Sequence, residues 1–260
     1  MPVMSTDTNT TTAPVSDSLQ SGAQFEESAL REMAEAGVFY GRKKSVTHPR
    51  MKPFIFATRN NVEIIDLEKT ITHLERAKSF LNDIMARKGR ILFVATQPSA
   101  REPMRALAEK FGMSYVVHRW LGGTLTNFKT INARINYFKN LREEEATGAL
   151  QKYTKKERVK FNKEIGRMRT LFGGLEVLTQ LPDVLFVINA DLHETAVREA
   201  RRMNIPVVAL ISTNQDPDCV GYPIPGNDTA PASIKWTLDT ISKDLEKAKL
   251  SQPTVNNPQA

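Results

Sequence analysis

The chain has 260 residues, of which 40% are hydrophobic, so it is long enough for one large domain, or a domain with an insertion, around a substantial core. Its 36 Lys and Arg residues exceed its 29 Asp and Glu residues by seven, and an excess of this sign bears on partners rather than on fold. The single cysteine, Cys219, excludes a disulfide framework and a multi-cysteine zinc site, and no apolar run is long enough to span a membrane, so we expect an intracellular protein without a membrane partner.

The N-terminal part predicts a tail, a short helix and a hairpin. Residues 1–24 are rich in Ser and Thr and lack apolar periodicity, which predicts a disordered tail. Apolar spacing from Phe25 predicts a helix over residues 25–36. We expect a loop and a strand over residues 41–59, because the prolines of this stretch disfavour helix. The runs "FIFAT" and "VEII" flank a short Asn-containing turn and predict two hairpin strands.

The middle and C-terminal parts alternate between strands and helices. Asp66 is placed to cap a helix that ends near Gly89. Continuous apolar runs separated by helices of about 10–15 residues are typical of βαβ units and of a parallel sheet covered on both faces. The strands are expected at "ILFVAT", "SYVVH", "DVLFVIN" and "VVALIS", and the helices at residues 99–111, 193–203 and 231–247. The sequence therefore predicts a doubly wound α/β domain over residues 25–126 and 179–248, followed by a flexible C-terminal tail over residues 249–260.

Residues 127–178 predict a helical insertion between the halves of this domain. Two apolar stripes at helical spacing, one starting at Phe128 and one at Phe161, are separated by the polar break "EEEATGALQKY". Two such helices of similar length should pair as an antiparallel hairpin. Between Lys129 and Arg169 there are twelve basic and five acidic residues, a balance of +7, so the rest of the chain sums to zero.

A second basic zone lies in residues 41–59, which contain six Lys and Arg residues and no acid. A single charge run is most often a solvated helix face. An acid-free loop together with a basic helical region favours a polyanionic partner instead, because like charges repel unless an anion lies between them.

The stretch "HRWLGGTLTNF" joins the α/β domain to the insertion. Trp120, between basic neighbours, is equally consistent with a half-buried core residue and with a platform that stacks on an RNA base. Thr126 or Asn127 is placed to cap the first insertion helix, whose free amides would suit an RNA phosphate.

An enzyme on the same fold is the alternative that we weighed. Neither G-x-G-x-x-G nor G-x-x-x-x-G-K-[ST] occurs, and no histidine stands at metal-ligand spacing, so we expect no cofactor and no metal. Asp191, His193 and Glu194 follow a strand where an α/β enzyme keeps catalytic groups, but Asp191 is more simply a helix cap. The segment "YPIPGND" is predicted to be a rigid turn before the last helix.

Eight motifs, in order, carry a resemblance to a known family. They are "EAGVFYG", "HPRMKPFIF", "IIDLEKT", "ILFVAT", "HRWLGGTLTNF", "LPDVLFVIN", "IPVVALISTNQDPD" and "YPIPGND". Together they resemble the bacterial small-subunit ribosomal proteins of the S-two family. The resemblance implies a flavodoxin-like α/β domain with a protruding helical hairpin, binding to small-subunit rRNA, no catalytic activity, and a position beside the mRNA-binding S-one protein. Two histidines frequent in the family are replaced by Phe39 and Arg42, which argues against a metal site there.

We therefore predict a cytoplasmic structural constituent of the small ribosomal subunit that binds small-subunit rRNA, contacts other small-subunit proteins and helps to dock the S-one protein. A nucleotide- or small-molecule-binding α/β enzyme is the alternative. The predicted RNA-binding residues are Arg42, Lys43, Lys44, Arg50, Lys52, Arg59, His118, Arg119, Trp120, Lys129, Arg134, Lys155, Lys156, Arg158, Lys163 and Arg167.

Overall fold

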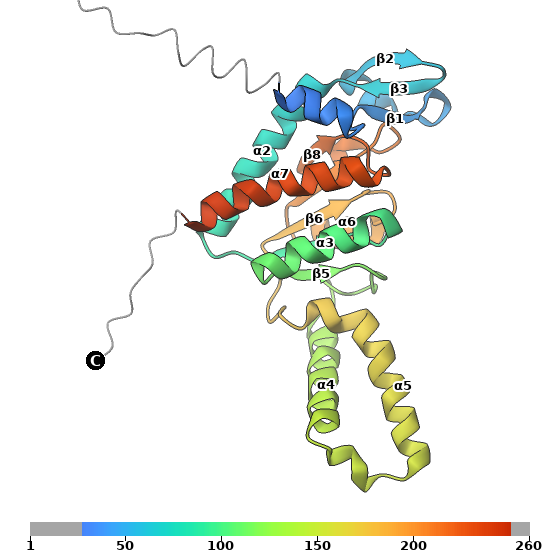
Figure 1. Ribbon diagram of the computed structural model, residues 1–260, viewed down its shortest axis with the longest axis vertical. Coiled ribbons are helices and arrows are strands. Elements are labelled where there is room, and N and C mark those ends of the chain that lie inside the picture. Colours follow the sequence, from blue (N-terminus) through green and yellow to red (C-terminus); the bar gives the residue numbers. More distant parts are fainter. Residues whose placement is uncertain (1–27, 251–260) are drawn as a thin grey trace, which may run out of the picture.

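The structure, a computed structural model, describes residues 28–250 (Figure 1). The tail predicted over residues 1–24, the first three residues of the predicted helix 25–36 and all but two residues of the predicted C-terminal tail lie outside the described residues. Within them, a helix over residues 28–35 is followed by Gly37, whose φ of 69° turns the chain out of the helix. The last helix, α7 (Pro231–Leu250), runs two residues past the predicted domain end at 248.

The first sheet is a small antiparallel one in the order β1-β3-β2. It comprises β1 (Tyr40–Lys43), β2 (Ile55–Arg59) and β3 (Val62–Ile65). Asn60 and Asn61 have positive φ angles of 49° and 61°, the conformation that a two-residue turn needs to match the strand twist, and this confirms the predicted hairpin. Strand β1 was not predicted, and two 3-10 helices, η1 (Lys44–Val46) and η2 (Pro49–Phe54), fill the expected loop.

The second sheet is parallel throughout, in the order β5-β4-β6-β7-β8. Its strands are β4 (Ile91–Val94), β5 (Ser114–Val116), β6 (Val184–Ile188), β7 (Val207–Ile211) and β8 (Tyr222–Pro225). This order is the flavodoxin-like form of the doubly wound α/β class, so the predicted fold class is confirmed. The predicted turn "YPIPGND" is wrong for its first four residues, which form the edge strand β8. An edge strand tolerates Pro223 and Pro225 because one side of its backbone needs no sheet partner.

Helices cover both faces of the parallel sheet and divide the core in two. Alternate strand side chains such as Phe93 and Phe186 face one layer, formed by α2 (Leu67–Ala86), α3 (Pro98–Phe111) and α7. The other set, including Leu92 and Val187, packs with α6 (Glu194–Arg202) and with apolar residues of the helical pair described next. The central strands β4, β6 and β7 are buried along their whole length, which explains their uninterrupted apolar runs.

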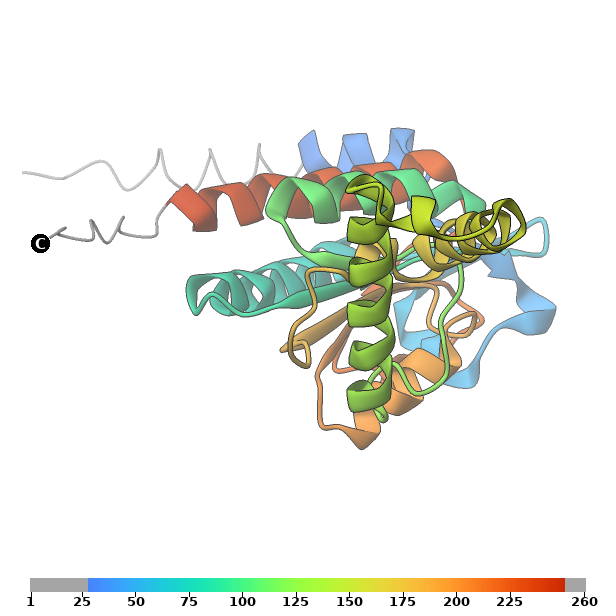
Figure 2. The same cartoon turned by 90° about the horizontal axis from the view of Figure 1, so that it is seen from below.

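Two helices leave the edge of the sheet beyond β5, as Figure 1 shows and as Figure 2 shows from below. They are α4 (Phe128–Ala146) and α5 (Lys155–Phe172), joined through η3 (Ala149–Lys152), and α5 leads into η4 (Gly173–Leu175). Both fall inside the stretch 127–178 assigned to the insertion. Their buried side chains repeat at helical spacing and meet in one apolar cluster: Ile135, Phe138, Leu141, Ile165, Met168 and Phe172.

Candidate nucleic-acid interface

The six basic residues of 41–59 divide into two that have carboxylate partners and four that do not. Arg42 donates to Asp228 at 2.9 Å, and Arg50 pairs with Asp216 at 2.8 Å and with Asp218 at 3.3 Å. The other four are exposed, and within residues 28–250 none forms an ion pair: Lys43, Lys44, Lys52 and Arg59. Positive charge free for a partner is therefore concentrated around β1, η2 and the end of β2.

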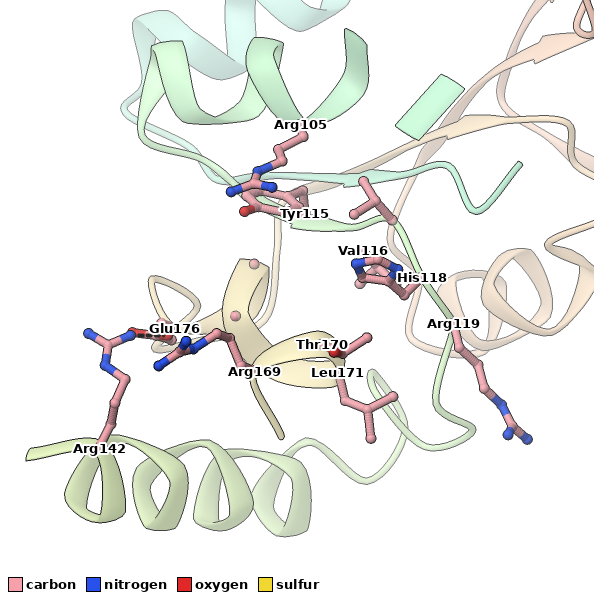
Figure 3. A pocket seen from close by; sticks show the side chains of 13 residues that line it. Arg105, Tyr115, Val116, His118, Arg119, Arg142, Arg169, Thr170, Leu171 and Glu176 are labelled. Carbon is pink, nitrogen blue, oxygen red and sulfur yellow. Dashed lines mark hydrogen bonds and ion pairs between the residues drawn. The ribbon is translucent and has the colours of Figure 1, made fainter. Parts of the chain in front are cut away.

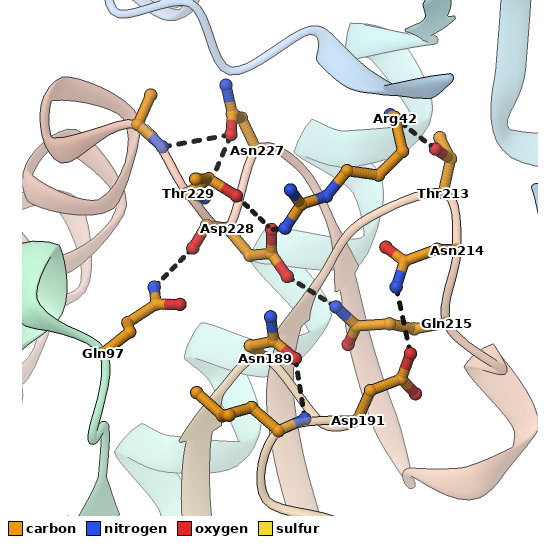
Figure 4. Close-up of polar contacts among 12 residues, drawn as sticks. Arg42, Gln97, Asn189, Asp191, Thr213, Asn214, Gln215, Asn227, Asp228 and Thr229 are labelled. Carbon is orange, nitrogen blue, oxygen red and sulfur yellow. Dashed lines mark hydrogen bonds and ion pairs between the residues drawn. The ribbon is translucent and has the colours of Figure 1, made fainter. Parts of the chain in front are cut away.

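Arg42 belongs to a polar network that ties the small sheet to the large one (Figure 4). Its partner Asp228 is fully buried and also accepts hydrogen bonds from Gln215 and Thr229. Burial raises the pKa of the Asp228 carboxyl, against the opposing effects of the Arg42 charge and of these hydrogen bonds. The Arg42 amide donates to Thr213 at 2.8 Å, which adds a second link between the sheets. These contacts are structural, since they use Arg42 within the chain.

The junction loop, residues 117–127 between β5 and α4, is held in place by the carboxylate of Glu199 on α6. It accepts hydrogen bonds from the amides of Gly123, Leu125 and Thr126 at 2.8, 3.0 and 3.2 Å, and from Trp120 Nε1 at 3.0 Å. Burial alone would raise the pKa of Glu199, but these hydrogen bonds outweigh it and hold the pKa below its usual value.

One sequence prediction about this loop is wrong. Neither Thr126 nor Asn127 caps α4 with its side chain, because the Thr126 hydroxyl donates to Glu199 instead. The prediction that the first-turn amides of α4 suit an RNA phosphate stays a prediction, because the Glu199 carboxylate takes the amides of Gly123, Leu125 and Thr126, which precede α4. Gly123, with φ of 89°, allows the tight turn that brings these amides together.

Trp120 lies half-buried against the core and is anchored by its hydrogen bond to Glu199. Its neighbours His118 and Arg119 are exposed. Of the two interpretations of Trp120, these contacts favour the half-buried core residue. The signal that could have found Glu199 is its place among Ala196, Val197 and Ala200, on the apolar side of a helix, where a carboxylate must find donors.

The predicted cations of the helical pair all lie at the surface. Lys129 and Arg134 belong to α4, and α5 carries the others: Lys155, Lys156, Arg158, Lys163 and Arg167. Helix α5 begins with a capping box in which Thr154 and Glu157 satisfy each other's backbone amides, so its first turn is fixed. The structure thus brings the predicted residues into two groups, one on the small sheet and one on the helical pair, with His118 and Arg119 beside the base of the latter.

Three arginines missed by the sequence reasoning line a cleft at the base of the helical pair (Figure 3). Arg105 comes from α3, Arg142 from α4 and Arg169 from α5. The cleft has a volume of about 400 Å³ and is also lined by His118 and Arg119. Residues so far apart in the chain are gathered only by the packing of η4 on β5.

At the edge of the sheet where an α/β enzyme would bind its ligand, His193 is held by hydrogen bonds within the chain. The loops that follow the neighbouring strands β4 and β6 diverge at this edge. Between them, the amide of Thr96 donates to His193 Nε2 at 3.1 Å, and His193 Nδ1 lies 2.9 Å from the carbonyl oxygen of Asn189. Burial lowers the pKa of His193, which keeps the ring neutral. The prediction that Asp191 caps the following helix is wrong: its carboxylate accepts from the Asn214 side chain at 3.0 Å, and α6 has no side-chain cap. In this loop, the Asn189 side chain accepts a hydrogen bond from the Leu192 amide.

Over residues 28–250 no group of three or more His, Cys, Asp or Glu side chains is placed to hold a metal ion. Within the same range no helix is long and apolar enough to cross a membrane.

Comparison with known proteins places these features in a family. The family model described as ribosomal protein S2 matches residues 33–248. A protein named small ribosomal subunit protein uS2 from Dehalococcoides mccartyi strain 195 is 43% identical over 220 residues, which cover 85% of this chain and 90% of that protein. One of the same name from Tolumonas auensis is 41% identical over 221 residues, covering 85% and 91% respectively. The chain belongs to the ribosomal protein S2 family, whose members are structural, non-enzymatic components of the ribosome.

Proposed function

We propose that this chain is a cytoplasmic structural constituent of the small ribosomal subunit that binds small-subunit rRNA with two exposed basic surfaces. The observation that carries the proposal is the set of solvent-exposed cations on two separate elements, the small sheet and the helical pair. Two basic surfaces on a rigid scaffold suit a folded polyanion whose phosphates lie at fixed separations.

The predicted RNA-binding residues divide into contacts and supports. We assign phosphate contact to the exposed residues: Lys43, Lys44, Lys52, Arg59, His118, Arg119, Lys129, Arg134, Lys155, Lys156, Arg158, Lys163 and Arg167. Arg42, Arg50 and Trp120 already have partners within the chain, so they position these surfaces. Phosphate contacts of this kind give affinity without base specificity, so specificity would come from the geometry that the fold imposes on them.

A salt titration tests the proposal. Binding of the purified full chain to small-subunit rRNA is measured over a range of KCl concentrations for the wild type and for the triple variant Lys155→Gln, Lys156→Gln, Arg158→Gln. Each lost phosphate contact reduces the slope of log K against log salt by about 0.7–0.9. The matched control neutralises three exposed lysines on α7: Lys235, Lys243 and Lys249. Equal slopes for the two triple variants would contradict the assignment of the helical pair as an RNA surface.

We also propose that the S-one protein docks on an apolar patch of the small sheet. Phe56 is 78% exposed at a bulge in β2, and Tyr40 is 50% exposed. A bulge re-aims a side chain, and here it places Phe56 beside a hollow of about 390 Å³ shared with Phe39 and Ile64. Exposed apolar surface of this kind is typical of protein contacts.

Co-purification of the S-one protein with Phe56→Ser chains tests this docking. We expect the S-one protein to be lost from the purified variant, while rRNA binding by the variant stays unchanged. Retention of the S-one protein by the variant would contradict the patch as its docking site.

A further inference from the structure

The cleft at the base of the helical pair contains three arginines that the proposed function leaves without a role: Arg105, Arg142 and Arg169. We propose that it binds one phosphate group, held between the α/β domain and the helical pair. The inference rests on the proposed function for the source of that phosphate, a backbone phosphate of bound rRNA. The site itself rests on the cleft alone.

The two walls of the cleft present guanidinium groups to each other. Figure 3 shows Arg105 and Tyr115 on one side and Arg142 and Arg169 on the other, with an open gap between them, whereas Arg119 points away. Because the side chains come from α3, β5, α4 and α5, one bound anion would bridge the α/β domain and both helices of the pair. A phosphate offers several acceptor oxygens to such forked donors.

Internal carboxylates orient these arginines without exhausting them. Arg105 Nε donates to Glu109 at 2.9 Å, and Tyr115 donates to the same oxygen at 2.8 Å. One terminal nitrogen of Arg142 donates to Glu176 at 2.6 Å. A guanidinium carries five N–H donors, so each arginine keeps donors for a ligand.

Arg169 is the least committed of the three arginines. Its nearest carboxylate oxygen, on Glu145, is 3.9 Å away, too far for a hydrogen bond. Glu176 is the one acidic residue among those lining the cleft, against four arginines. The cleft therefore has a net positive charge and unfilled donor capacity.

Gly174 in η4 allows the base of the helical pair to approach β5 closely. A side chain at this position would overlap the carbonyl oxygen and the ring of Tyr115, so the turn lies directly against the β5 backbone. A cleft formed by such close packing needs no closing movement to bind an anion, so less conformational entropy is lost on binding than in a site that must first close.

The first test measures rRNA binding by full-length single variants. Arg105→Gln and Arg169→Gln should each weaken binding about fivefold and lower the salt slope by about 1. Glu176→Gln removes the opposing charge and should tighten binding about twofold, an increase that a merely structural role would not produce. Arg76→Gln, at an exposed position of α2, is the matched control and should bind as the wild type does.

A second arm uses inorganic phosphate as the probe, with NMR detection of the arginine Nε–H resonances. Phosphate-dependent shifts in the wild type that are absent from Arg169→Gln support the site independently of RNA, and show that it also takes free phosphate. If the wild type binds rRNA but Arg105→Gln and Arg169→Gln match the control, the inference is overturned while the proposed function stands. If the wild type does not bind rRNA, the proposed function fails, and the absence of phosphate shifts would overturn the cleft as well.

Discussion

Among single substitutions that remove a polar contact of the junction loop, loss of the Glu199 carboxylate on α6 should lower the free energy of unfolding most. Its carboxylate accepts from three backbone amides, the Thr126 hydroxyl and the Trp120 indole at 2.8–3.2 Å, and Glu199 is only 8% exposed. A hydrogen bond to a charged group contributes about 1.5–3 kcal/mol, and such bonds to a single acceptor are not additive. We expect Glu199→Ala to cost about 3–5 kcal/mol of unfolding free energy. Glu199→Gln should cost about 2 kcal/mol, because one acceptor oxygen remains while the new amide group opposes the donors.

Urea unfolding followed by tryptophan fluorescence measures these costs. The chain has two tryptophans, so a Trp236→Phe background makes Trp120 the reporter of the loop. Glu194→Gln on the same helix is the control, because Glu194 is exposed and pairs with the exposed Arg198, and its effect should stay within about 0.5 kcal/mol. A cost for Glu199→Gln no larger than that of Glu194→Gln, with unchanged Trp120 emission, would refute the anchoring role of Glu199.

Three further predictions concern other parts of the fold. The folded chain holds His193 neutral, whereas the unfolded chain takes up a proton on this side chain below about pH 6.5, so the free energy of unfolding should fall between about pH 7 and pH 5.5, and should fall less in His193→Gln. Urea unfolding at the two pH values measures this, and an equal loss of unfolding free energy in both proteins would count against it. Gly174→Ala should lower the free energy of unfolding by about 1–3 kcal/mol through overlap with Tyr115, whereas Gly166→Ala, in an open position of α5, should raise it by about 0.5–1 kcal/mol. Thermal unfolding measures both changes, and a change of the same sign in the two variants would be evidence against the packing described. Burial, and then nearby carboxylates, raise the pKa of the Cys219 thiol from its ordinary 9.0 to about 11, so its alkylation by iodoacetamide near neutral pH should be about a hundredfold slower than in the urea-unfolded chain, and equal rates would contradict that burial.

Local patterns were enough to predict most of the α/β domain. Asp66 before a helical apolar stripe predicted α2 and its cap, and the Asp66 carboxylate does accept from the Glu68 and Lys69 amides. The turn residues Asn60 and Asn61 adopt the left-handed conformation that their side chains tolerate. In these cases the information lies within a few residues of the element that it specifies.

Features that depend on distant partners could not be predicted in this way. Strand β8 contains two prolines, which indicate a turn locally, and it becomes a strand only because β7 provides an edge. Arg42 and Asp228 are 186 residues apart in the sequence, so nothing near Arg42 indicated that its charge would be used internally.

The candidate interface shows the same division. The sequence indicated which segments are basic, whereas the distinction between free and paired cations emerged only from packing. Nothing in the sequence singled out Arg105, and Arg142 and Arg169 counted only as part of the basic insertion, because their shared cleft depends on how the helical pair meets β5. The sequence indicated an RNA-binding surface, but it did not show where individual phosphates would be held.

Sedimentation of a tagged chain from cell lysate tests the central claim most directly. The account predicts that the wild type comigrates with the small ribosomal subunit at low salt and is released at high salt, because its attachment is through phosphates. A variant with five α5 cations replaced by Gln should move largely to the top of the gradient while staying folded: Lys155, Lys156, Arg158, Lys163 and Arg167. Wild-type chain that stays at the top of the gradient, or a variant that comigrates with the small subunit as fully as the wild type, would contradict the account.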